Sequence, residues 1–160
     1  MEAFPCAIEI RHATPAELHD AYAMVCEYYE AAGVVQRETE ETFFRDYFGA
    51  GAGVWLARSG DHIMGCIALR RQSEPHSGEI KRMYVKPEAR GRGIAQRLLE
   101  AVEAFARASG YRSIYLDTTD QMRAAVSLYQ RNGYQACPRY NDNPQATMFM
   151  RKLLAPWFEA

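Results

Sequence analysis

The sequence has no long apolar run and no surplus of charge of either sign. No stretch approaches the roughly 18 consecutive apolar residues that cross a bilayer, so we expect no membrane span. Lysine and arginine together number 19 and aspartate and glutamate 20, for a formal net charge of -1. This balance removes the bulk attraction that draws proteins to nucleic acid, and we expect no nucleic acid among the partners. The N-terminus lacks a basic segment followed by an apolar one, so the sequence predicts a cytoplasmic protein.

Metal-binding patterns and internal linkers are also missing. Cys6, Cys26, Cys66 and Cys137 form no Cys-x-x-Cys pair, which predicts buried free thiols rather than zinc or a redox dithiol. The four histidines are equally scattered, and we expect no metal. No Pro/Gly/Ser-rich stretch, charge block or repeat interrupts the chain, so residues 1–160 are predicted to form a single domain.

The segment EIKRMYVKPEARGRGIA, residues 79–95, is the most informative part of the chain. A strand is predicted over residues 79–85, and Pro87 ends it because proline removes a ladder donor and fixes its own φ. An Arg/Gly loop then opens an amphipathic helix. Apolar residues recur along this helix at the spacing of one buried stripe. They are Ile94, Leu98, Val102 and Phe105.

The start of this helix offers a site for an anion. Its first N-H groups lack intrahelical acceptors and lie at the positive end of the helix dipole, which favours a bound pyrophosphate. Gly91 and Gly93 allow the backbone to approach such a ligand closely, and Arg90 and Arg92 add positive charge. A P-loop needs Gly-Lys-Ser/Thr and a dinucleotide fingerprint needs a third glycine, and neither is present; a purely structural turn is the alternative.

Two patterns, in this order along the chain, carry a family resemblance. Residues 90–95 fit Arg/Gln-x-x-Gly-x-Gly/Ala, and residues 128–134, after a predicted strand over 113–117, fit Leu-Tyr-x-x-x-Gly-Phe/Tyr. The chain thereby resembles the GNAT (N-acetyltransferase) superfamily, whose acyl-CoA pyrophosphate loop has the first pattern. One departure is Met122, where family members often place an asparagine that binds the pantetheine arm.

The resemblance implies an α/β (α+β) fold with a GNAT-like mixed, mostly antiparallel sheet. We expect about six to seven strands, flanked by about four helices and splayed at the acyl-CoA site. Further elements are predicted in the family's order. They are a first strand near 7–12, helices within 15–32, 38–48 and 121–134, a hairpin at 54–71, and closing strands near 134–138 and 146–153.

The resemblance also implies an acetyl-CoA-dependent N-acetyltransferase that moves the acetyl group to a primary amine by direct attack in a ternary complex. Acetyl-CoA is then the co-substrate, without a metal. Backbone N-H groups around Met83 to Val85 are expected to stabilise the oxyanion and to pair with the pantetheine arm. The expected cofactor-binding residues are Met83, Tyr84, Val85, Arg90, Gly91, Arg92, Gly93, Ile94 and Ala95.

Two residues are candidates for proton transfer. Tyr129 occupies the position of the tyrosine that serves as general acid toward the CoA sulfur in many family members; a core aromatic is the alternative. Glu79 stands at the same sequence distance from Arg90 as the general base of the histone-acetylating branch, and a solvated glutamate at a strand start is the alternative.

The acceptor is the least determined part of the prediction. Arg70 and Lys81 on strands, and Tyr140 and Asn143 in the segment 138–144, are candidate substrate-binding residues, although exposed strand cations and a plain hairpin loop explain the same pattern. A small-molecule amine is favoured. The alternatives are a protein N-terminus or lysine, and a non-catalytic acyl-CoA-binding sensor. A homodimer is also possible.

Overall fold

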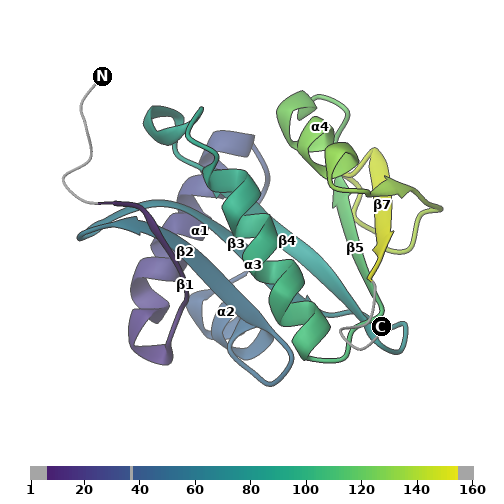
Figure 1. The fold of residues 1–160 in the computed structure, drawn as a ribbon, viewed down its shortest axis with the longest axis horizontal. Helices are drawn as coiled ribbons and strands as arrows, with labels where there is room; N and C mark the ends of the chain where they lie inside the picture. Colours follow the sequence, from purple (N-terminus) through teal and green to yellow (C-terminus); the bar gives the residue numbers. More distant parts are fainter. Residues whose placement is uncertain (1–6, 37, 155–160) are drawn as a thin grey trace.

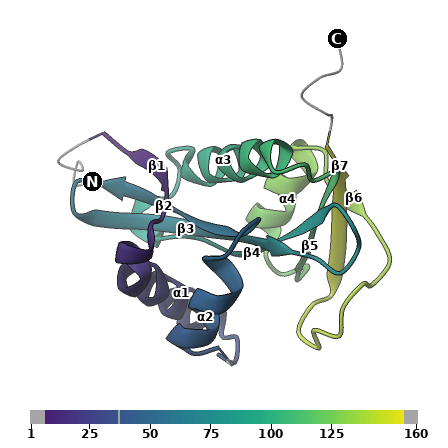
Figure 2. The ribbon, with the colours of Figure 1, turned by 90° about the horizontal axis from the view of Figure 1, so that it is seen from below.

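The computed structural model describes residues 7–36 and 38–154, which form one sheet with helices on both faces (Figures 1 and 2). The seven strands of this part of the chain lie in the order β1-β2-β3-β4-β5-β7-β6, and only the β4-β5 pair is parallel. The strands are β1 Glu9–His12, β2 Gly53–Ser59, β3 His62–Arg71, β4 Ser77–Val85, β5 Ser113–Thr118, β6 Gln135–Ala136 and β7 Met148–Leu153. The α-helices are α1 Leu18–Ala32, α2 Glu40–Tyr47, α3 Ile94–Ala108 and α4 Arg123–Arg131, and two 3-10 turns are Pro15–Glu17 and Pro87–Ala89. The predicted mixed, mostly antiparallel fold is confirmed.

The helices divide between the two faces of the sheet. In Figure 2, α1 and α2 lie below the sheet, whereas α3 and α4 lie above it. Each face has its own buried cluster, the lower one including Val25, Phe43 and Cys66. The upper cluster includes Ile94, Leu98 and Val102 of the predicted stripe on α3, but Phe105 is only partly buried at its edge.

Local chemistry sets several element boundaries. Helix α1 ends at Gly33, whose φ of 65° places it in the left-handed conformation that glycine tolerates best. Thr39 caps α2, because its side chain accepts from the N-H of Thr42. Gly133, at φ 91°, follows the end of α4, so the predicted helix over 121–134 shortens to Arg123–Arg131. The predicted closing strand near 134–138 is only the short pair Gln135–Ala136.

The sheet opens between β4 and β5. Their parallel register runs from Ser77↔Ser113 to Ile80↔Leu116 and then stops, although β5 continues to pair with β7 as far as Thr118. Figure 1 shows β4 and β5 diverging toward the end of the sheet where α3 begins. We call this opening, between β4 beyond Ile80 and β5 beyond Leu116, the seam. It confirms the splay expected at the predicted acyl-CoA site.

A bulge lies in β4 directly beyond Ile80, the last β4 residue that pairs with β5. The β3-β4 register shifts between the Cys66↔Tyr84 pair and the Ala68↔Lys81 pair, so two residues of β4 stand opposite one of β3. Arg82, within this bulge, has a φ of 59°. The bulge therefore changes the direction of the backbone where β4 loses its partner.

No helix of the described residues is both long and apolar enough to cross a bilayer.

Candidate active site

Four cavities follow one another along the seam and beyond it. The loop cavity, of about 650 Å³, is lined by Gly91 and Gly93, and the central cavity, of about 340 Å³, by Tyr129. The outer cavity, of about 480 Å³, is lined by Glu38, and the distal cavity, of about 520 Å³, by Glu79. Neighbouring cavities share lining residues and therefore adjoin one another, and we call the row of four cavities the trough. The shared residues include Met83 and Met122 for the first pair, Lys81 and Arg82 for the second, and Arg70 and Asn141 for the third.

The predicted anion loop opens into the loop cavity. Gly91 and Gly93 have φ values of 81° and 75°, and no atom beyond their chain neighbours lies within 4 Å of the position where a Cβ would stand on either. Gly93 is the N-cap of α3 and supplies no side chain, so the first N-H groups of the helix keep no side-chain acceptor from the cap. The Arg90 Nε donates to the Val85 carbonyl at 3.1 Å and so ties the loop to β4.

Most of the predicted cofactor-binding residues come together in this cavity. Its walls include Met83, Tyr84, Val85, Arg90, Gly91, Gly93, Ile94 and Ala95, whereas Arg92 is not among them. The cavity is also lined by Arg123 and Arg131, at the two ends of α4, and by Tyr28 of α1. The sequence did not predict these three residues. Arg123 precedes the Leu-Tyr pattern of residues 128–134 and Arg131 lies within it, so their place beside this pattern was the available signal.

Tyr129 lies at the centre of the trough. It is 4% exposed and lines the central cavity together with Tyr28 and Met83. Burial raises the pKa of Tyr129 above its usual value, and Tyr28 and Asp117 add to the rise. The phenol therefore stays protonated at working pH. It makes no hydrogen bond to another described residue, so its proton is available to a ligand.

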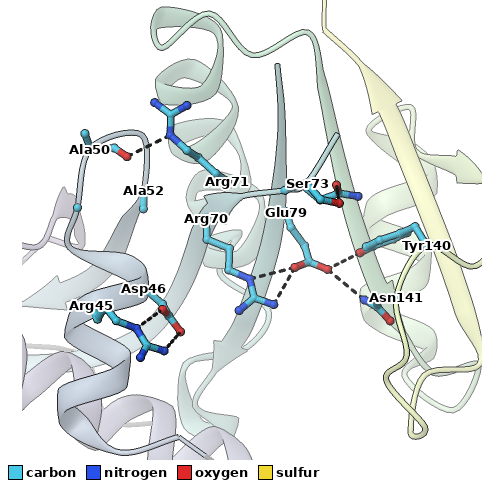
Figure 3. Close-up of a pocket in the computed structure, with 12 residues that line it drawn as sticks. Arg45, Asp46, Ala50, Ala52, Arg70, Arg71, Ser73, Glu79, Tyr140 and Asn141 are labelled. Atoms are coloured by element: carbon cyan, nitrogen blue, oxygen red, sulfur yellow. Dashed lines mark hydrogen bonds and ion pairs between the residues drawn. The ribbon is translucent and has the colours of Figure 1, made fainter. Parts of the chain in front are cut away.

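Glu79 is held by donors on both of its carboxylate oxygens (Figure 3). Oε1 accepts from Arg70 Nε at 3.1 Å and lies 3.1 Å from Arg70 Nη2. Oε2 accepts from the Tyr140 hydroxyl at 2.7 Å and from Asn141 Nδ2 at 3.2 Å, and Lys81 Nζ stands 3.3 Å away. Glu79 is 3% exposed and lines the distal cavity, whereas Tyr129 lines the central cavity.

A second carboxylate continues this network across the seam. Asp117, at the end of β5, accepts from Lys81 Nζ at 2.9 Å and from Asn141 Nδ2 at 2.6 Å. Burial alone would raise the pKa of Asp117, but the charge of Lys81 and the hydrogen bonds from Lys81 and Asn141 outweigh it and lower the pKa. Arg70, Lys81, Glu79 and Asp117 together carry no net charge, and Asn141 bridges the two carboxylates.

Arg82 forms a further ion pair at the boundary of the central and outer cavities. Its Nε donates to Glu38 Oε1 at 3.0 Å, and its guanidinium lies 5.0 Å from the centre of the Tyr29 ring. The Tyr29 hydroxyl donates to the same Glu38 oxygen at 2.9 Å. Glu38 lies in the segment between α1 and α2 and no sequence pattern marked it, because its contact with β4 spans 44 positions of the chain.

The candidate acceptor residues separate between cavities. Lys81 and Asn143 line both the central and the outer cavities, Arg70 lines the outer and distal cavities, and Tyr140 lines the distal cavity. Both cations have carboxylate partners, so neither is a bare solvated charge as the alternative supposed.

The cysteines only partly follow the prediction of buried thiols. Cys66 is buried, but Cys26 on α1 and Cys137 after the edge strand β6 are half-buried, and Cys6 lies outside the described residues. No group of three or more potential metal ligands occurs among the residues that the structure describes.

Comparison with known proteins places the chain in a family. The model of the "Acetyltransferase (GNAT) family" matches residues 18–134, which include the loop, the seam and Tyr129. This chain belongs to the GNAT family. Among curated relatives of this GNAT protein, an aminoalkylphosphonate N-acetyltransferase of Salmonella typhimurium is 32% identical over 136 residues, covering 79% of this chain and 84% of the relative. N-acetyltransferase family 8 member 2 of Rattus norvegicus is 36% identical over 100 residues, or 60% of this chain, which spans only 44% of the rat protein.

Solved GNAT structures share the fold. An acetyltransferase of Staphylococcus aureus superposes with a TM-score of 0.80 at 21% identity, covering 93% of this chain and 100% of that one. An acetyltransferase of Salmonella typhimurium determined with acetyl-CoA has a TM-score of 0.73 at 17% identity, covering 93% and 95%.

Proposed function

We propose that this GNAT protein is an acetyl-CoA-dependent N-acetyltransferase that acetylates a primary amine by direct attack in a ternary complex. The observation that carries the proposal is the trough of adjoining cavities. It joins the glycine loop at the start of α3 to a central cavity containing a protonated tyrosine, and then to polar cavities large enough for a second substrate.

Acetyl-CoA is proposed to bind along the loop cavity and the seam. The pyrophosphate would accept from the first N-H groups of α3, where Gly91 and Gly93 leave open space and Arg90 and Arg123 add positive charge. The pantetheine arm would run beside β4 beyond Ile80, where β5 no longer supplies backbone partners. This path brings the thioester to the central cavity. A solved relative in complex with acetyl-CoA supports this choice of cofactor.

The proton transfers are assigned to the two predicted residues. As the amine nitrogen bonds to the thioester carbon and the C-S bond breaks, Tyr129 gives its proton to the departing thiolate. Glu79 is proposed to take the amine proton. Because Glu79 lines only the distal cavity and its oxygens already accept from Arg70, Tyr140 and Asn141, it would act on the amine through intervening water.

A small-molecule amine is the proposed acceptor. The outer cavity combines charged side chains with Asn141 and Asn143, which suits an acceptor with polar groups of its own. The name of the Salmonella relative, an aminoalkylphosphonate acetyltransferase, supports a small amine. A protein N-terminus or lysine is the alternative acceptor. A cytoplasmic location and a homodimer stay predictions from the sequence.

The proposal is tested by measuring thiol release from acetyl-CoA with a panel of amines, and by mass spectrometry of the products. The panel spans aminoalkyl phosphonates and carboxylates, neutral amines, and peptides with a free N-terminus or lysine. We expect an acetylated small amine and thiol release well above acceptor-free hydrolysis. Calorimetric binding of acetyl-CoA without transfer to any amine or peptide would instead identify a non-catalytic sensor.

A further inference from the structure

Arg82 adopts a backbone conformation that its side chain does not favour. Its φ of 59° lies in the left-handed region, and among the described residues other than glycine only His76, in an exposed turn, shares it. Such a conformation persists where the surroundings hold it in place, and it is often found at functional sites. Arg82 is held in two ways.

The first constraint acts on the Arg82 side chain. The guanidinium is fixed by Glu38 at 3.0 Å and by the face of Tyr29 at 5.0 Å. These contacts attach the bulge to the segment that precedes α2. They secure the position of Arg82 but leave open which way its carbonyl points.

The second constraint acts on the backbone carbonyl of Arg82. The Cys66 Sγ lies 3.2 Å from the Arg82 carbonyl oxygen and donates its S-H to it. Cys66 is 0% exposed and belongs to the last regular pair of β3 and β4 before the register shifts. Burial raises the pKa of the Cys66 thiol to about 12, so the thiol keeps its proton at working pH.

Peptide geometry connects this contact to the seam. In a planar trans peptide the C=O and the following N-H point in opposite directions. The Arg82 carbonyl is directed at Cys66 on β3, so the Met83 N-H is directed away from β3, to the side where β4 has lost its pairing with β5. Met83 lines both the loop cavity and the central cavity, where the thioester is proposed to lie.

We propose that Cys66 is a positioning residue for acyl transfer. Its S-H holds the Arg82 carbonyl, and the same peptide plane then directs the Met83 N-H at the thioester carbonyl oxygen, which gains negative charge as the amine attacks. This inference rests on the proposed acetyl transfer. Cys66 itself touches neither substrate and forms no covalent intermediate.

The test compares donor with non-donor side chains at position 66. Cys66→Ala removes the donor, and Cys66→Ser keeps a donor of similar size. We expect kcat to fall about tenfold in Cys66→Ala, with the KM of acetyl-CoA within about twofold of the parent, and to recover in Cys66→Ser to within about threefold. Cys137→Ala, at a half-buried cysteine outside the trough, is the control and should keep the parent's kcat. Cys66→Val, which also lacks a donor, replaces Cys66→Ala if that variant melts early.

A second measurement is independent of turnover. The Met83 amide resonance of ¹⁵N-labelled protein should shift on binding acetyl-CoA, and the shift should be larger in the parent and Cys66→Ser than in Cys66→Ala. If parent turnover is absent, the proposed function fails, yet this comparison still reports the peptide direction. Equal kcat in all three proteins, or equal losses in Cys66→Ser and Cys66→Ala, would show that Cys66 only packs.

Discussion

Tyr129 and Glu79 have opposite hydrogen-bonding situations although both are almost fully buried. The hydroxyl of Tyr129 has no partner among the described residues and borders the central cavity. The carboxylate of Glu79 accepts from three side chains and lies beside Lys81. The tyrosine is therefore ready to donate, whereas the glutamate has to give up a contact before it accepts.

Tyr129→Phe should lower kcat by about 10²-fold while the affinity for acetyl-CoA hardly changes, because the ring still packs but the proton donor is gone. Steady-state kinetics and calorimetry measure the two quantities. Tyr134→Phe is the matched control, since Tyr134 is equally buried but donates to Glu103 at 3.1 Å. The control should lose stability and keep kcat. A Tyr129→Phe rate within about threefold of the parent would mean that Tyr129 only packs.

Glu79→Gln should lower kcat/KM by about 10²-fold, because glutamine cannot accept a proton. The values of kcat and KM are measured on the same amine for parent and variant. Tyr140→Phe is the control, since it removes one hydrogen bond to Glu79 and leaves the carboxylate. If both variants only raise the KM of the amine and keep the parent's kcat, Glu79 anchors the segment carrying Tyr140 and Asn141 rather than accepting the proton.

Residues whose role depends on local backbone chemistry could be predicted from the sequence, and those brought in by tertiary contact could not. Gly91 and Gly93 are required by their positive φ values, which a strand-loop-helix pattern already indicates. Glu38 and Asn141 reach the site across 44 and 24 positions of the chain, and no local pattern marks either of them. Cys66 was predicted to be buried but not to contact the bulge.

At the scale of elements, the start of α3 and the strands β4 and β5 determine where acetyl-CoA, the acetyl donor, is proposed to bind. Strongly periodic elements such as α3 were predicted well: the stripe from Ile94 to Phe105 lies within the helix Ile94–Ala108, since a buried stripe leaves little freedom in its position. Short elements were predicted less well. β6 pairs only through Gln135 and Ala136, at the edge of the sheet, and its extent depends on β7 rather than on its own sequence.

Gly93→Glu should abolish acetyl-CoA binding, raising the Kd by more than about 100-fold, because a carboxylate would occupy the pyrophosphate site. The substitution also strains a positive φ. Gly110→Glu is the matched control: Gly110, just after α3, has a φ of 83° and equally open space around it, but does not line the loop cavity. Both variants should melt earlier by a similar amount, and only Gly110→Glu should bind acetyl-CoA in calorimetry. Normal binding by Gly93→Glu would contradict the loop assignment.

The ion pair between Asp117 of β5 and Lys81 of β4 should make the stability of the fold depend on pH. Because the pKa of Asp117 is lowered from 3.8, its ion pair stabilises the fold above that value, and the contribution is lost as pH falls through the lowered pKa. Asp117→Asn should cost about 1–3 kcal/mol at pH 7, since Lys81 keeps only Glu79 as a partner. In urea titrations the difference from the parent should shrink below pH 4. Asp61→Asn, at an exposed turn, is the control; a difference that stays constant down to pH 3 would argue against this ion pair.

At the scale of the whole molecule, donor and acceptor are proposed to enter opposite ends of one trough and to meet in the central cavity. No cysteine, serine or histidine is among the described residues that line this cavity, and Lys81 is held between two carboxylates. Thr118, Thr119 and Asp117 do line it, so the absence of an acetyl-enzyme is an expectation of the proposed direct attack. Initial rates should give intersecting rather than parallel double-reciprocal plots, and mass spectrometry of protein mixed with acetyl-CoA alone should show no added acetyl group on a trough residue.

The seam also affects how the sheet behaves without its ligand. The strands β1 to β4 and the strands β5 to β7 are joined by only four register pairs, Ser77↔Ser113 to Ile80↔Leu116. Beyond them the N-H and C=O groups of β4 that point away from β3 face a position that no strand of the described residues occupies. A cofactor that pairs there would act as a temporary strand of the sheet. Backbone amides on both sides of the seam should then exchange with deuterium fastest in the free protein and slow together on binding, because one small molecule joins two halves that the chain itself leaves partly separate.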